Sequence, residues 1–164
     1  MKEDGLEELV FFDSEPILAY RVWWITLDDG EPQNLRSLTY KIRWKPRRPL
    51  RAHCLFELSR RQASFHPNEQ CPCLTHTCGV YALKDPVGLD AWGKVYGTYT
   101  QANLLRVVGQ VALWGKVLQH ELGYRAEYAY PVSFVAPEDP EIADWLELGV
   151  PGSLVPSYAV GTVW

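Results

Sequence analysis

The residues best suited to chemistry lie between positions 54 and 78, where all four cysteines and two of the four histidines occur: Cys54, His66, Cys71, Cys73, His76 and Cys78. Thiolate and imidazole are the ligands that zinc prefers, in tetrahedral sets of four. Cys73 and Cys78 are separated by four residues, a spacing within the range of a pair that grips one ion. We therefore expect a structural zinc ion with ligands drawn from Cys54, His66, Cys71, Cys73 and Cys78.

Within that set, Cys54, His66, Cys73 and Cys78 are the preferred four, Cys71 is the first replacement, and His76 is expected to be a bystander. The spacing lacks two clean Cys-x-x-Cys pairs, so other interpretations remain open. The thiols can be buried without chemistry, or they can be redox or nucleophilic groups. An iron–sulfur cluster would need all four thiols. A nucleophilic cysteine needs a nearby base, and the sequence fixes no geometry between the thiols and any histidine.

A basic tract lies near the end of the first third of the chain. Residues 41–51 read KIRWKPRRPLR, with Trp44 among the cations. Such a tract can bind phosphates and stack a base, it can be a solvated strand face, or it can meet an acidic protein. The candidate polyanion-binding residues are Lys41, Arg43, Lys45, Arg47, Arg48 and Arg51.

The basic tract contrasts with the chain as a whole, whose net charge is −4. A negative net charge argues against a protein that binds nucleic acid over its entire surface. An uneven distribution of charge along the chain can still steer a polyanion to one face. No apolar run is long enough for a transmembrane helix, and the acidic start lacks the features of a signal peptide. We expect a cytoplasmic protein without membrane contact.

Hydrophobic periodicity predicts the elements that position these residues. Strands are expected at Ile17–Thr26, Leu38–Lys45, Cys54–Leu58, Gly79–Leu83, Leu105–Gln119 and Tyr124–Tyr130. Asp85-Pro86 predicts a helical turn, and Asp139–Leu148 predicts a short helix capped by Asp139. Seven Trp and nine Tyr favour a β-rich core, with an aromatic ligand surface as the alternative.

The clearest prediction is a hairpin that turns at Leu122-Gly123. Its register would place Lys116 opposite Glu127 and Trp114 near Ala129. Tyr128 would then cover Gly115, as an aromatic side chain does for a strand glycine. A helix over the same stretch is the competing interpretation.

These elements predict an α+β fold: a curved, mainly antiparallel sheet or partial barrel with one or two short helices and a metal-pinned Cys/His loop. Residues 1–148 would form a single β-rich domain. Residues 149–164 contain no charged side chain and would form an ordered tail. An ordered apolar tail must pack, either on its own domain or as a docking strand for a partner or a second copy.

Three segments carry a resemblance: Cys-Gly-Val-Tyr-Ala at 78–82, Leu-Trp-Gly-Lys-Val at 113–117 and Gly-Tyr-Arg-Ala-Glu-Tyr-Ala-Tyr-Pro at 123–131. They resemble uncharacterised bacterial proteins, a resemblance that implies no activity. The bent strand and hairpin are also similar to PUA-like and SH3-like barrels, several of which bind nucleic acid.

The expected function is a non-enzymatic, metal-stabilised binding module for a protein or a nucleic acid. No convergent set of acid, base and nucleophile can be read from the sequence, although catalysis normally needs one. Two alternatives remain: a thiol- or metal-dependent enzyme that uses the Cys71–Cys78 loop, and a structural subunit that docks through residues 149–164.

Overall fold

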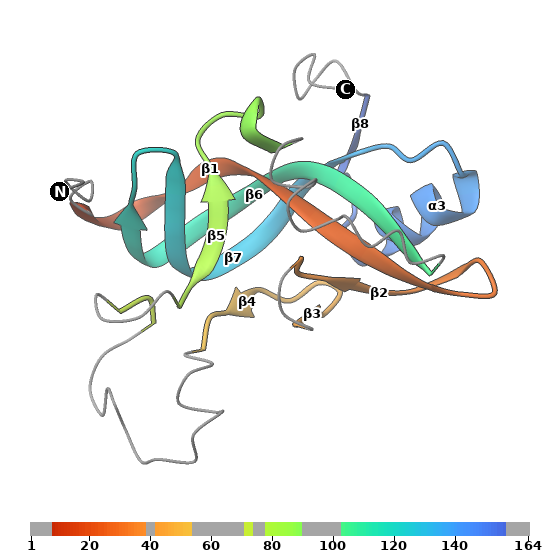
Figure 1. Ribbon diagram of the computed structural model, residues 1–164, viewed down its shortest axis with the longest axis horizontal. Helices are drawn as coiled ribbons and strands as arrows, with labels where there is room; N and C mark the ends of the chain where they lie inside the picture. Colours follow the sequence, from red (N-terminus) through yellow and green to blue (C-terminus); the bar gives the residue numbers. More distant parts are fainter. Residues whose placement is uncertain (1–7, 39–41, 54–70, 74–77, 90–102, 157–164) are drawn as a thin grey trace, which may run out of the picture.

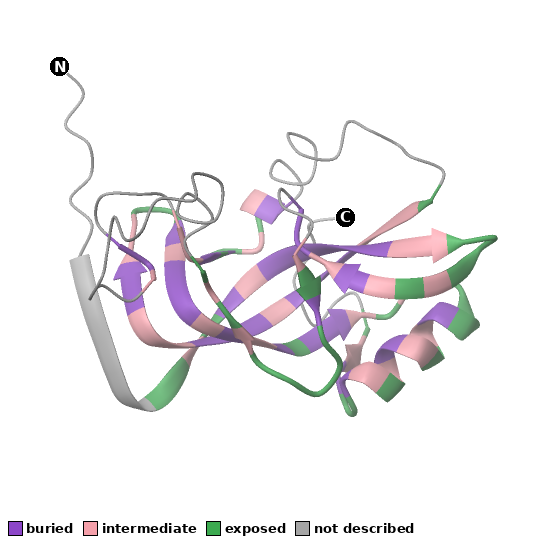
Figure 2. Cartoon of the chain, turned by 90° about the horizontal axis from the view of Figure 1, so that it is seen from below, coloured by how far each residue is buried: buried purple, intermediate pink, exposed green. Residues whose placement is uncertain are grey.

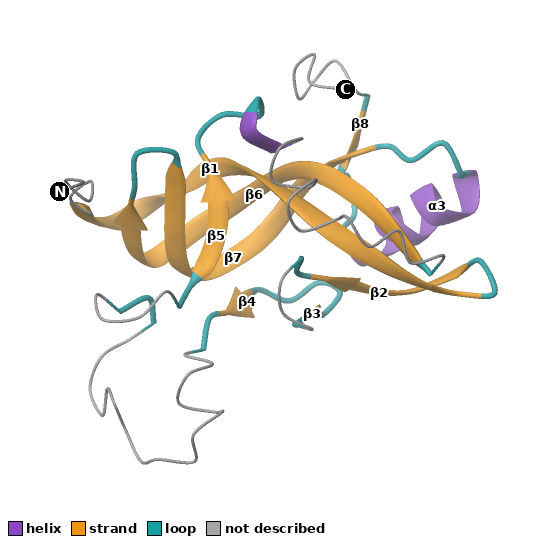
Figure 3. Ribbon diagram, viewed as in Figure 1, coloured by secondary structure: helices purple, strands orange, loops and turns teal. Residues whose placement is uncertain are grey.

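The computed structural model describes residues 8–38, 42–53, 71–73, 78–89 and 103–156. Most of these residues belong to one curved sheet, with a helix near one end (Figures 1 and 3). The elements are β1 (Glu8–Asp28), β2 (Glu31–Arg36), β3 (Arg43–Trp44), β4 (Leu50–Arg51), β5 (Val80–Leu83), β6 (Leu104–Gln119), β7 (Gly123–Val135), α3 (Pro140–Gly149) and β8 (Leu154–Val155).

Four strands pair in a circuit. β1 pairs with β6, β6 with β7, β7 with β5, and β5 returns to β1 through the single partner pair Tyr20 and Leu83. These four pairings are antiparallel, and only β8 runs parallel to its partner, β7. The predicted β-rich fold with a curved, mainly antiparallel sheet is therefore confirmed.

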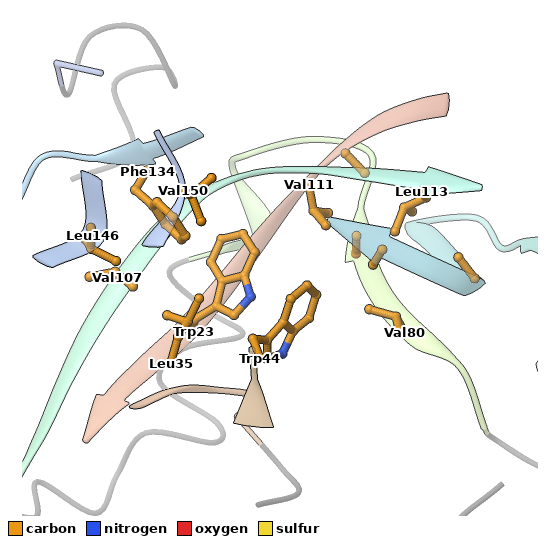
Figure 4. Packing of buried hydrophobic residues seen from close by; sticks show 14 of the residues in the cluster. Trp23, Leu35, Trp44, Val80, Val107, Val111, Leu113, Phe134, Leu146 and Val150 are labelled. Carbon is orange, nitrogen blue, oxygen red and sulfur yellow. The ribbon is translucent and has the colours of Figure 1, made fainter. Parts of the chain in front are cut away.

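The middle of β1, residues 21–25, is buried on both faces, as the apolar sequence of Ile17–Thr26 predicts. Trp23 belongs to the larger core cluster, where it meets Trp44 edge-on at 5.7 Å and Phe134 at 5.1 Å between ring centroids (Figure 4). Val22 and Trp24 point the other way, into a second cluster. The middle of the long strands is mostly buried or intermediate, whereas the β1–β2 turn is exposed (Figure 2).

The β6–β7 hairpin is confirmed, with one irregularity. Val117 pairs with Ala126 in the predicted register, and Trp114 pairs with Tyr128 rather than Ala129. The register shifts because Gly115 and Lys116 form a bulge, with Gly115 at φ 77°. In the bulge the Lys116 amide donates to Glu127 Oε2 at 3.1 Å, and Tyr128 lies against Gly115 as predicted.

The prediction of a strand over Leu38–Lys45 is wrong in extent. Among the residues of this stretch that the structure describes, only Arg43–Trp44 forms a strand, and it pairs with β2, a strand that was not expected. Leu38 lies in a bend and belongs to the second core cluster, so it does not share a face with Trp44. The Ser37 amide donates to the Ile42 carbonyl at 3.0 Å, a hydrogen bond that joins the residue after β2 to the residue before β3. The predicted strand Cys54–Leu58 lies outside the described residues.

Helix α3 begins as predicted. Asp139 accepts a hydrogen bond from the Glu141 amide at 2.9 Å, and Ile142 and Leu146 are buried. The first part of the uncharged tail packs on its own domain, since the Phe134 amide donates to the Ser153 carbonyl and β8 pairs with β7. Residues 157–164 of the tail lie outside the described residues.

Candidate functional site

Two of the predicted metal ligands lie side by side. The Sγ atoms of Cys73 and Cys78 are 3.4 Å apart, and the Cys73 amide donates to Cys78 Sγ at 3.3 Å. Cys73 is buried, whereas Cys78 and Cys71 are partly exposed. Cys73 and Cys78 therefore form a close pair of thiols, in which Cys73 is buried and Cys78 is partly exposed.

Arg125 on β7 anchors this dithiol. Its Nη1 donates to the carbonyls of Cys73 at 3.3 Å and Cys78 at 2.9 Å, and its Nε donates to His120 Nε2 at 3.0 Å. The guanidinium spans these three acceptors because its donors form a rigid fork. Arg125 is only 2% exposed, so a buried positive charge lies beneath the cysteine loop.

This geometry is compatible with the predicted zinc ion and does not test it. Sulfur ligands on a tetrahedral zinc lie roughly 3.8 Å apart, given Zn–S bonds of about 2.3 Å, so the spacing of Cys73 and Cys78 suits a shared ion. Cys54, His66 and His76 lie outside the described residues. Within the described ranges, no group of three or more His, Cys, Asp or Glu side chains is arranged to hold a metal. The zinc ion and the metal-pinned loop thus stay predictions.

A pocket of about 290 Å³ lies between β2, β3, β7 and the end of α3. Three aromatic side chains, Trp44, Tyr130 and Trp145, line it together with the exposed Arg43 and Lys45. The other lining residues are Gln33, Asn34, Leu35, Pro46, Pro131, Leu146, Leu148, Gly149 and Val150. This arrangement suits a flat ring with an attached negative charge.

Ser37 and Arg21 fix the side chain of Trp44, which forms one wall of the pocket. Trp44 Nε1 donates to Ser37 Oγ at 2.9 Å, and Arg21 donates to the same hydroxyl at 3.1 Å. Arg21 also donates to the Tyr81 carbonyl, and its guanidinium lies 5.2 Å from the Trp44 ring centroid. Burial lowers the pKa of Arg21 to about 9, because the charged guanidinium loses hydration. The orientation of Trp44 is thus fixed before any ligand enters.

The predicted polyanion-binding residues do not all face this pocket. Arg43 and Lys45 line it, and Arg48 is exposed nearby in sequence. Arg47 instead donates from Nε to the Leu148 carbonyl at 3.4 Å, at the negative end of α3. Arg51 lies 3.8 Å from Glu127 and over the Tyr128 ring. Lys41 lies outside the described residues.

Sequence reasoning missed Arg125, Tyr130 and Trp145 as site residues. Trp145 packs against the core, and its half-buried side chain also lines the pocket. The residues next to Arg125 in the sequence do not indicate that it binds the cysteine backbone. The pairing of β5 with β7 brings Arg125 next to the Cys78 carbonyl, which is distant in the sequence. No local pattern signals either residue.

No family model, curated protein or solved structure matches the chain. The resemblance to uncharacterised bacterial proteins and to PUA-like or SH3-like barrels therefore stays a prediction. Among the described residues, every helix is too short or too polar to cross a bilayer.

Proposed function

We propose that this protein is a non-enzymatic binding module that holds a single-stranded nucleic acid at the pocket between β2, β3 and α3. The observation that carries the proposal is the meeting of the half-buried Tyr130 and Trp145 with the exposed Arg43 and Lys45 around one cavity of about 290 Å³. Trp44, which is 3% exposed, forms the inner wall of this cavity. Aromatic side chains stack bases of any sequence, and cations beside them bind the phosphates.

The dimensions and stiffness of the pocket support a small planar occupant. Its volume is near the lower end of ligand pockets, which hold roughly 300–1,000 Å³, so it suits one base better than a folded protein segment. The hydrogen bond from Trp44 to Ser37 and the edge contact with Trp23 hold one wall in place. A preformed wall reduces the entropy lost on binding.

The lining also supports binding rather than catalysis. Among the described residues that line the pocket, none is a Cys, His, Asp or Glu. His, Cys, Asp and Glu are the commonest catalytic acids, bases and nucleophiles, and Lys45 and Tyr130, which can also serve, have none of them beside them in the lining. Cations and aromatic rings without them are typical of a binding surface for a polyanion.

The test is titration of the protein with a fluorescein-labelled oligothymidine, followed by anisotropy at several salt concentrations. We expect binding that weakens steeply with salt, because phosphate contacts release counterions. Lys45→Gln should weaken binding several-fold and lower the salt slope, and Trp145→Phe should weaken it less than Trp145→Ala. Each stacked base contributes about 1–3 kcal/mol, so Trp145→Ala should raise Kd at least fivefold.

Lys84→Gln is the matched control, since it removes one positive charge outside the pocket, beside the Tyr124 ring. This variant should bind like the wild type. Salt-independent binding, or an equal loss in Lys84→Gln and Lys45→Gln, would show that the pocket does not bind the strand. If the protein bound an acidic protein but not the oligonucleotide, the proposed nucleic-acid ligand would be wrong and a protein partner would take its place in the proposal.

A further inference from the structure

The cysteine loop carries a second inference that is independent of the pocket. We infer that Cys73 and Cys78 form a reversible disulfide by exchange with a low-molecular-weight disulfide such as glutathione disulfide. The juxtaposition of these two sulfur atoms over Arg125 points to this modification site.

The two sulfur atoms need to move little. They lie 3.4 Å apart, and a disulfide bond is about 2.05 Å long, so a contraction of about 1.4 Å joins them. Arg125 Nη1 donates to the carbonyls of both cysteines at once. The backbones of the two residues are therefore held at a common anchor in the dithiol state, and little chain entropy is lost when the bond forms.

The two sulfur atoms have different environments, and this difference assigns their roles. Cys78 is partly exposed, and its Sγ accepts the Cys73 amide hydrogen at 3.3 Å. Exchange begins with the attack of a thiolate on a disulfide sulfur, so the more accessible Cys78 meets a disulfide from solution before the buried Cys73 does. Cys73 is buried beside it, in the position of a resolving thiol.

The chemistry balances in two exchange steps. The Cys78 thiolate attacks one sulfur of glutathione disulfide, which forms a mixed disulfide and releases one glutathione thiolate. The Cys73 thiol then loses its proton to solvent and attacks Cys78 Sγ, and the second glutathione leaves as thiolate. The protein loses two electrons and two protons in total, and one glutathione disulfide becomes two glutathione molecules after protonation.

The chain offers a convenient readout by mass spectrometry. Cleavage after Arg and Lys places Cys71, Cys73 and Cys78 in one peptide, residues 62–84, and Cys54 in another, residues 52–60. The full-length protein is incubated in glutathione buffers of graded ratio, alkylated and digested. A Cys73–Cys78 bond removes the mass of two hydrogens from peptide 62–84 and blocks two alkylations.

Serine variants assign the pair. Cys71→Ser is the matched control and should oxidise like the wild type, since Cys73 and Cys78 remain. Cys73→Ser should instead stop at a glutathione adduct on Cys78, and Cys78→Ser should lose the fast reaction. Loss of oxidation in Cys71→Ser, a crosslink to peptide 52–60, or one tightly bound zinc per chain that protects both thiols would overturn the inference. A failure of nucleic-acid binding leaves it intact, because no step involves the pocket.

Discussion

Gly109 of β6 lies so close to the backbone of Ser133 on β7 that a Cβ atom on Gly109 would sit 1.8 Å from the Ser133 carbonyl oxygen. The two strands can therefore pair at this point only without a side chain. Gly109 also pairs with Arg21 of β1, so the same residue contacts both neighbours of β6 in the circuit.

Gly109→Ala should lower the free energy of unfolding by about 3 kcal/mol, because relief of the clash requires a shift of the β7 backbone. Urea denaturation followed by fluorescence measures the change. Gly149→Ala is the control, since its nearest contact would be Pro46 Cβ at 4.0 Å, and it should cost less than about 1 kcal/mol. Equal midpoints for the two variants would contradict the close approach.

Arg21→Lys should destabilise the protein by about 2 kcal/mol, because one ammonium group cannot serve both the Tyr81 carbonyl and the Ser37 hydroxyl. The near-ultraviolet circular dichroism of Trp44 should change as well, because Ser37 also holds that ring. The exposed Arg43→Lys change on β3 is the control and should leave both properties unaltered. A wild-type spectrum for Arg21→Lys would show that Trp44 is fixed without Arg21.

Arg125→Lys should expose the cysteine loop, since a lysine cannot donate to the carbonyls of Cys73 and Cys78 and to His120 together. We expect alkylation of Cys73 by iodoacetamide to accelerate about tenfold, which corresponds to roughly 1.4 kcal/mol of lost protection. Arg106→Lys is matched, because Arg106 donates to the Leu89 carbonyl at 3.0 Å elsewhere in the fold. The anchor is disproved if the two variants react at the same rate.

Asp139→Ala should lower the free energy of unfolding by about 1 kcal/mol, because the Glu141 amide loses its acceptor at the start of α3. Asp139→Asn retains an acceptor oxygen and should recover most of that loss. Both are measured by chemical denaturation. Two variants of equal stability would mean that the cap contributes nothing beyond helix propensity.

The types of the long elements and of the four-residue β5 could be predicted from the sequence, whereas the two-residue strands could not. β1, β6, β7 and α3 have enough periodic residues to show their type, and Asp139 marks the helix start. β3 and β4 contain two residues each and have no pattern of their own. They exist because Trp44 and Leu50 pack on the core and because β2 and β7 offer partners.

The sequence predicts those parts of the candidate sites whose residues are close together along the chain. The close approach of Cys73 and Cys78 follows from four intervening residues, and the basic residues beside Trp44 are adjacent in sequence. The pocket requires Tyr130 and Trp145 from elements that meet only in three dimensions. The register shift at Gly115 shows the same limit, since a bulge moves the strand beyond it by one residue.

The pairing of β1 with β6 has a consequence for synthesis on the ribosome. β1 is translated shortly before β2, its first partner, but Trp23 meets Val107 only after the intervening chain has been made. At about 5–20 residues per second this delay is on the order of seconds to tens of seconds. During that time one edge of β1 has no strand of this sheet beside it, and its tryptophans lack much of their core. The nascent chain should thus engage chaperones until β6 emerges.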